Sequence, residues 1–256
     1  MGEIAKGVYA GASQEMIEDL RREFIEDSLE QVRALAGSLA NGADVDAMRR
    51  FVFECKGQAH NFNMPLLESV AQRFESFLSG VGDSPGAMAP NIHAFLDGIG
   101  DILDGTVAAD EDPAAVVRGL PAKPACFDEN SIEVRDVEVM LVMLHGAQTH
   151  FVEREMQACG YRVTIVTSTF EALEQVARTK PDMVIISAVM GGLSGVDLAV
   201  ALSAMPETRN VPVALITSHA RDHESLRFLP ASVPVISKSE SFGDDLAAAL
   251  DHHFLL

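Results

Sequence analysis

One predicted helix, residues 44–63, carries side chains whose types and spacing could do chemistry. At about 100° per residue, four of them fall within an arc of roughly 100°, on a face separate from the apolar stripe of the helix. They are Phe53, Lys56, Gly57 and His60. The lysine supplies a cation, the glycine leaves room for close approach, and an imidazole can exchange a proton or act as a nucleophile. Such a face is unusual on a purely structural helix, so these residues are a candidate functional surface.

A second set of chemically active side chains follows the strand-like runs of the C-terminal half. Apolar runs indicate strands at residues 139–144, 162–166, 183–187, 211–217 and 233–237. The carboxyl ends of parallel strands meet at one edge of a sheet, where such sheets form a ligand-binding crevice. The residues at that edge would be Leu144, His145, Ser187, Thr217 and Lys238. No glycine-rich phosphate loop accompanies them.

Amphipathic helices must position the first set. Apolar residues at helical spacing predict helices over residues 13–40, 44–63, 65–80 and 86–103. Ser13 is a suitable N-cap for the first of them. Four such helices with short connections favour an antiparallel four-helix bundle.

A segment rich in proline and acidic residues separates this bundle from the strands. We interpret residues 107–136 as an interdomain linker with one helical turn near residues 114–118. Beyond the linker, helical patterns alternate with the strands at residues 148–158, 169–179, 196–204, 222–228 (a weak pattern) and 242–254. This alternation predicts a flavodoxin-like (βα)5 fold with a doubly wound parallel sheet.

The expected organisation is therefore a two-domain chain of class α + α/β. A flexible N-terminus (1–12) precedes the helical bundle (13–106), the linker (107–136) and the α/β domain (137–256).

The helical half resembles the histidine phosphotransfer (HPt) family. The resemblance rests on Phe24-Ile25-Glu26-Asp27, Lys56-Gly57, Asn61-Phe62 and Pro65-Leu66. The family's core motif is His-x-x-Lys-Gly, in which the lysine helps to neutralise a phosphoryl group on the histidine. The resemblance implies that Phe53 stands where that histidine would be. A phenyl ring has no nucleophilic nitrogen, so the family's chemistry is excluded at this position.

Two residues of this face have open interpretations. Phe53 either packs at the flank of the bundle or anchors a partner. His60, two turns further along, is either an ordinary surface histidine or a displaced phosphoacceptor.

The α/β half resembles the receiver family of response regulators. The resemblance rests on residues 182–195, Cys159-Gly160-Tyr161, residues 211–217 and residues 235–238. It implies that Ser187 takes the place of the phosphoacceptor aspartate. Leu144 and His145 take the places of the acidic pair that binds Mg²⁺. Of the residues that a working receiver needs, only Thr217 and Lys238 remain, at the positions that contact the phosphoryl oxygens.

The switch of the receiver family is altered as well, because Val235 stands at the position of its aromatic residue. The nearest acids in sequence are Asp182, which starts the third strand, and Asp197, which belongs to the following helix. Neither of these acids can take the place of the carboxylates that the pocket lacks. We therefore expect no metal site, no cofactor and no catalytic residue.

Composition excludes several function classes. The net charge is −19, from 19 Lys and Arg against 38 Asp and Glu. Both halves are acidic and neither has a basic stripe, which argues against binding to nucleic acid or to an anionic membrane. The three cysteines, Cys55, Cys126 and Cys159, form no metal-binding pair, and no signal peptide or membrane span is evident. These features predict a cytoplasmic protein.

The resemblances predict a non-enzymatic adaptor of a bacterial two-component phosphorelay that works by docking. Expected partners are histidine kinases, receivers or HPt proteins, and a homodimer through the last strand and helices is a further expectation. Two alternatives stay open. One is phosphotransfer through a non-standard histidine, His60 or His145. The other is small-ligand sensing in the crevice lined by His145, Ser187, Thr217 and Lys238.

Overall fold

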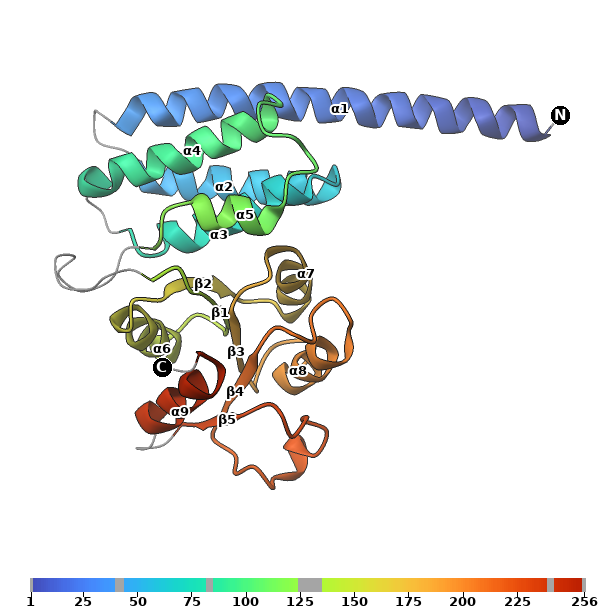
Figure 1. Ribbon diagram of the computed structural model, residues 1–256. Helices are drawn as coiled ribbons and strands as arrows, with labels where there is room; N and C mark the ends of the chain where they lie inside the picture. Colours follow the sequence, from blue (N-terminus) through green and yellow to red (C-terminus); the bar gives the residue numbers. More distant parts are fainter. Residues whose placement is uncertain (1, 40–43, 82–84, 124–134, 239–241, 255–256) are drawn as a thin grey trace. The chain divides into compact units, whose positions relative to one another are not determined.

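The computed structural model describes residues 2–39, 44–81, 85–123, 135–238 and 242–254 (Figure 1). The chain divides after Val116 into two compact units. Cys126 lies outside the described residues.

The first unit is helical. Its elements are α1 (Gly2–Ser38), α2 (Val45–Asn61), α3 (Pro65–Leu78), the 3₁₀ turn η2 (Pro85–Met88) and α4 (Ala89–Leu103). α2 packs on α3, α4 packs on α1 and α3, and α1 also contacts α2. Aromatic contacts join α3 to α4, since the ring of Phe95 stacks on that of Phe74 (4.7 Å) and lies tilted against that of Phe77 (5.0 Å). The helical prediction for this half is confirmed.

The starts of α2 and α3 follow local capping chemistry, whereas two other predicted helix starts differ from the structure. Asp44 caps α2 by accepting a hydrogen bond from the Ala47 N–H (2.9 Å), and Pro65 opens α3. The predicted start at Ser13 is wrong because α1 begins at Gly2 and runs through the segment expected to be a flexible N-terminus. Residues 2–12 contain no proline that would interrupt the helical ladder. The helix expected from residue 86 begins as the turn η2 and becomes α-helical only at Ala89.

The second unit is a five-stranded parallel sheet in the order β2-β1-β3-β4-β5, as predicted for a flavodoxin-like fold. The strands are β1 (Glu138–Val142), β2 (Arg162–Val166), β3 (Met183–Ser187), β4 (Val213–Thr217) and β5 (Val235–Ser237). Every residue of β1, β3 and β4 is buried, as expected for a parallel sheet covered on both faces.

Helices cover both faces of this sheet. They are α6 (Ala147–Ala158), α7 (Thr169–Thr179), α8 (Gly195–Ala204) and α9 (Phe242–Phe254). Apolar residues of α6 and α9 join one core cluster, and those of α7 and α8 join the other. The weak helix expected at residues 222–228 is only a short 3₁₀ turn, η3 (Glu224–Leu226).

The predicted linker contains the helix α5 (Pro113–Gly119), which is longer than the single turn expected. Linker residues 124–134 lie outside the described part of the chain. Among the described helices, none is both long enough and apolar enough to cross a membrane.

Candidate functional site

Strand order brings most of the second candidate set to one edge of the sheet. Ser187 ends β3, where it pairs with Ile216 of β4. Thr217 ends β4 and pairs with Ser237, the last residue of β5. The next backbone N–H, that of Lys238, donates to the Thr217 carbonyl (3.0 Å). Ser187, Thr217 and Lys238 therefore lie at the carboxyl edge, where the sequence placed them.

The two hydroxyls at this edge are buried and serve their own loops. Ser187 is 5% exposed, and its Oγ donates to the carbonyl of Val189 (3.3 Å). Thr217 is 2% exposed, and its Oγ1 accepts from the His219 N–H (3.1 Å). Both groups thus shape the turns that follow β3 and β4.

The loop after β3 is held close to the strand by a glycine. Gly195 opens α8, and its N–H donates to the Ala188 carbonyl (3.1 Å). A Cβ atom built on Gly195 would lie 1.9 Å from the backbone oxygen of Ser187. Only glycine allows the helix to begin this near to the end of β3.

Two of the residues that follow β1, Leu144 and His145, are exposed. Leu144 and His145 precede α6, and the Leu144 carbonyl accepts a hydrogen bond from Thr149 Oγ1 (2.5 Å). Lys238 is also exposed, and partial burial of its ammonium lowers its pKa from the usual value. Val235, which the sequence predicted to stand at the switch position, is half-buried in β5 opposite Leu215.

The two acids nearest to Ser187 in sequence have other partners. Asp182 precedes β3 at the amino edge of the sheet, where it binds Arg118 (3.0 and 3.2 Å). The Asp197 carboxylate accepts from Ser194 Oγ (2.6 Å) at the start of α8.

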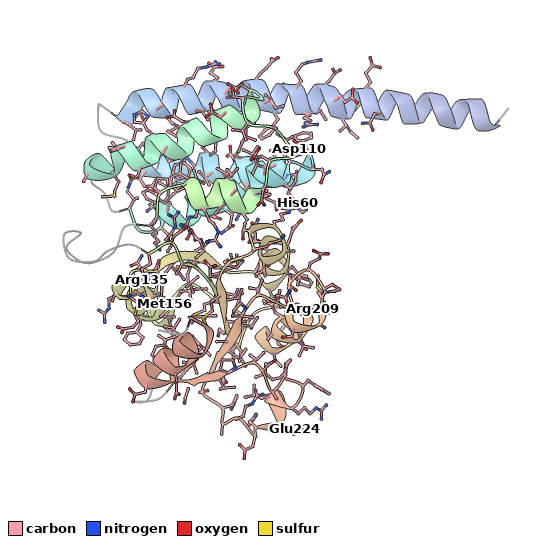
Figure 2. All side chains as sticks on the ribbon, viewed as in Figure 1. His60, Asp110, Arg135, Met156, Arg209 and Glu224 are labelled. Carbon is pink, nitrogen blue, oxygen red and sulfur yellow. The ribbon has the colours of Figure 1, made fainter. Side chains whose placement is uncertain are left out.

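Three residues of the first candidate set share an exposed surface of α2. Phe53 is 67% exposed, Gly57 is exposed, and a Cβ atom on Gly57 would meet nothing within 4 Å. His60 is exposed near the C-terminal end of the helix (Figure 2). An approaching molecule would therefore meet a phenyl ring, a bare stretch of backbone and an imidazole.

Lys56 turns away from this surface toward α3. Its Nζ lies 2.5 Å from Glu75 Oε2 and 2.9 Å from Gln72 Oε1. The ammonium is thus engaged within the helical unit. Beside it, the Nδ1 atom of His60 lies 3.3 Å from Oε1 of the buried Glu68 carboxylate, which can orient the imidazole.

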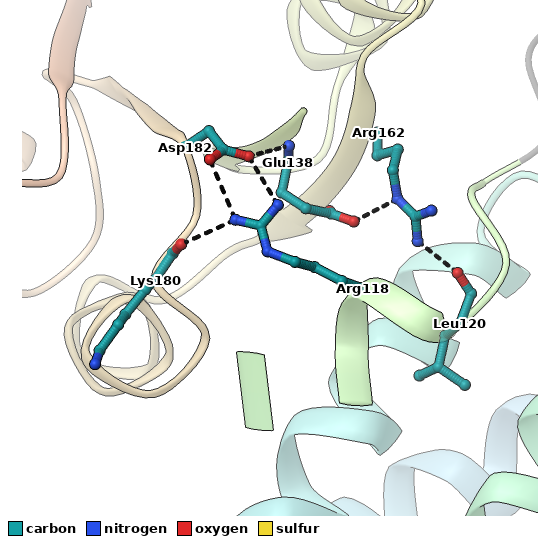
Figure 3. Close-up of polar contacts among 6 residues, drawn as sticks. All are labelled: Arg118, Leu120, Glu138, Arg162, Lys180 and Asp182. Atoms are coloured by element: carbon teal, nitrogen blue, oxygen red, sulfur yellow. Dashed lines mark hydrogen bonds and ion pairs between the residues drawn. The ribbon is translucent and has the colours of Figure 1, made fainter. Parts of the chain in front are cut away.

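The sequence interpretation missed a polar cluster at the amino edge of the sheet (Figure 3). The Asp182 carboxylate binds Arg118 and also accepts from the Glu138 N–H (2.8 Å). The Glu138 carboxylate pairs with Arg162, whose guanidinium also donates to the Leu120 carbonyl (2.5 Å). The sequence does contain a signal for this cluster, because charged residues stand at the starts of three strands that are neighbours in the order β2-β1-β3.

A further ion pair attaches residue 123 to the α/β unit. The ammonium of Lys123 contacts the carboxylate of Glu153 on α6, and both side chains are buried. Residues 118–123, predicted to be linker, are therefore fastened to the α/β unit.

Comparison with known proteins assigns the second unit. Residues 139–248 match the family described as "Response regulator receiver domain". The chain is 27% identical over 96 residues to the phosphate regulon transcriptional regulatory protein PhoB of Rhizobium meliloti (strain 1021). This match covers 38% of the chain and 39% of that relative, so the chain spans well under half of its length. The C-terminal unit contains a receiver domain of two-component signalling.

Solved structures are similar at low sequence identity. The receiver domain of sensor histidine kinase PA1611 from Pseudomonas aeruginosa PAO1 is 22% identical, with a TM-score of 0.41, over 46% of this chain and 96% of that one. The response regulator PhyR from Brucella abortus is 17% identical, with a TM-score of 0.38, over 91% of this chain and 83% of that one.

Proposed function

We propose that the protein is a non-catalytic signalling adaptor of a two-component pathway. It acts by docking, through a receiver domain that accepts no phosphoryl group and through a helical unit of the phosphotransfer type. Its partners are histidine kinases, receivers or phosphotransfer proteins.

The main observation behind this proposal is the residue at the end of β3. Where a working receiver has a carboxylate nucleophile, Ser187 offers a buried hydroxyl that donates to its own loop. A neutral hydroxyl neither attracts a hard cation as a carboxylate does nor reacts readily with a phosphoryl donor. Leu144 and His145 add no carboxylate to the loop that follows β1.

The helical unit supports the same conclusion. We infer that α1 to α4 form an HPt-like bundle in which Phe53 stands in the histidine position. Lys56 is held by Glu75 and Gln72 rather than presented to a phosphoryl group. An exposed phenyl ring beside an uncovered glycine suits a contact between proteins, because aromatic anchors contribute strongly to interfaces.

Binding measurements test the docking role. The full chain is titrated, by biolayer interferometry, against purified histidine kinases, receivers and phosphotransfer proteins of its host. We expect at least one to bind, and Phe53→Ala to weaken that binding tenfold or more. Phe170→Ala, at an equally exposed ring on α7 of the receiver domain (66%, against 67% for Phe53), shows which unit a partner contacts, because a partner of the helical unit should lose affinity only with Phe53→Ala. Absence of binding to every such protein contradicts the proposal.

One observation favours a competing function. His60 is exposed and lies beside the Glu68 carboxylate, an arrangement that can orient a nucleophilic imidazole. Incubation with a phosphorylated receiver tests this alternative. An acid-labile phosphoryl group that disappears in His60→Gln would make the protein a phosphotransferase.

A further inference from the structure

A groove lies between α1 and α2, with a cavity of about 470 Å³. Its apolar lining includes Phe51 and Cys55, which are buried, and the stacked rings of Phe24 and Phe62, whose centroids are 5.5 Å apart. Burial raises the pKa of the Cys55 thiol to about 12, so this group is neutral. The buried lining of the groove is therefore uncharged and mainly apolar, with the hydroxyl of Ser28 as its buried polar group.

Carboxylates surround this apolar interior. Glu23 and Asp27 of α1 and Glu54 of α2 line the groove and are exposed. Of the described residues that line it, none is Lys, Arg or His. The electrostatic potential of the groove is therefore negative, without a basic side chain of its own to balance it.

An exposed apolar stripe continues the groove along α1. Met16, Ile17 and Leu20 are all at least 49% exposed, and Leu20 also lines the groove. The spacing of these residues places them on one side of the helix. The surface available to a partner is thus longer than the cavity.

We propose that the α1–α2 groove binds an amphipathic helix of a partner protein, with an apolar ridge and Lys or Arg residues along its flanks. The apolar ridge would contact Phe24, Phe51 and Leu20, as helices do when they lie in hydrophobic grooves. The basic flanks would meet Glu23, Asp27 and Glu54, which favours this partner through charge complementarity.

A second copy of the chain is a poorer occupant. Residues 14–31 of α1 contain seven Asp or Glu residues and two Arg residues. Two copies joined along this face would bring like charges together, which costs binding energy.

This site is separate from the docking surface of the proposed function. At about 100° per residue, Phe53 and His60 lie roughly opposite Phe51 and Phe62 around α2. Substitutions of Glu23 and Asp27, which lie on α1, therefore leave the Phe53 surface of α2 intact, and the two proposals can fail independently.

A designed peptide tests the inference on the full chain. The probe is a fluorescent helical Leu/Lys peptide with apolar residues at helical spacing, compared with a scrambled peptide of the same composition. Fluorescence anisotropy at physiological salt measures both affinities. We expect the amphipathic peptide to bind at least tenfold more tightly than the scrambled one, because charge alone does not distinguish them.

Matched variants localise the binding. The groove variant combines E23Q and D27N on α1, and we expect it to weaken binding of the amphipathic peptide tenfold or more. The control variant, E15Q with E18Q, removes the same charge from exposed residues of α1 outside the groove and should change the affinity less than twofold. Circular dichroism confirms that both variants are folded.

Three results would overturn the inference. They are equal affinity for the two peptides, equal weakening by the two variants, and a dimer in sedimentation experiments that Leu20→Ala, which removes an apolar side chain of the groove, dissociates. The last result would make a second copy of the chain the occupant.

Discussion

At the end of β3, the hydroxyl and the carbonyl of Ser187 both have close contacts in the following loop and helix. The Ser187 hydroxyl donates to Val189, and the Ser187 carbonyl lies against the first residue of α8. In the proposed function this serine takes the place of the phosphoacceptor, and the loop after β3 packs closely against it. Since Ser187 is buried, a change in the size of a side chain next to it must be accommodated by the surrounding backbone.

Gly195 gives the first prediction at this scale. Gly195→Ala should lower the free energy of unfolding by about 3 kcal/mol, because the new methyl group overlaps the backbone of Ser187. Urea denaturation measures the change. Gly191→Ala is the control, since its Cβ would meet nothing within 4 Å. Equal stability of the two variants would contradict the close approach at β3.

Cys55 gives the second prediction. Its thiol pKa rises to about 12 on burial, from an ordinary value of 9.0, so the folded protein keeps a proton that the unfolded chain loses above pH 9. The contribution of this thiol to stability is complete below pH 9 and falls as the pH rises toward 12. Accordingly, Cys55 should resist iodoacetamide at pH 8.5 in the native protein while the exposed Cys159 reacts, as peptide mass mapping would reveal. Equal labelling would disprove the burial of Cys55.

At the scale of elements, contacts distant in sequence account for what the sequence could not predict. Strands and helices followed from apolar periodicity, and β2, β3, α7 and α9 have the predicted bounds. Periodicity does not reveal a contact such as Arg118–Asp182, which joins residues 64 positions apart. The same limit hid the pairing of Lys56 with Glu75 and the groove between α1 and α2.

The fastening of residues 118–123 gives the third prediction. Glu153→Gln leaves the buried Lys123 ammonium without its carboxylate, and should lower the free energy of unfolding by about 3 kcal/mol. Thermal or urea denaturation measures this change. The double variant Lys123→Met with Glu153→Leu removes both charges and should recover most of the loss. If the single variant is as stable as the wild type, the pair does not hold this segment.

At the scale of the whole molecule, a receiver domain and a helical unit share one acidic chain. The net charge is −19, and exposed apolar side chains occur in both units among the described residues. Such a composition suits contacts between proteins. The account therefore depends on whether either unit still accepts a phosphoryl group.

Phosphoryl incorporation tests this claim most directly. The full chain is incubated with acetyl phosphate and Mg²⁺, and separately with a phosphorylated histidine kinase, beside a working receiver as the positive control. Intact mass spectrometry at neutral pH then detects any added phosphoryl group. We predict labelling of the control receiver and none of this protein. A stable aspartyl phosphate, or a phosphohistidine at His60 or His145, would contradict the account.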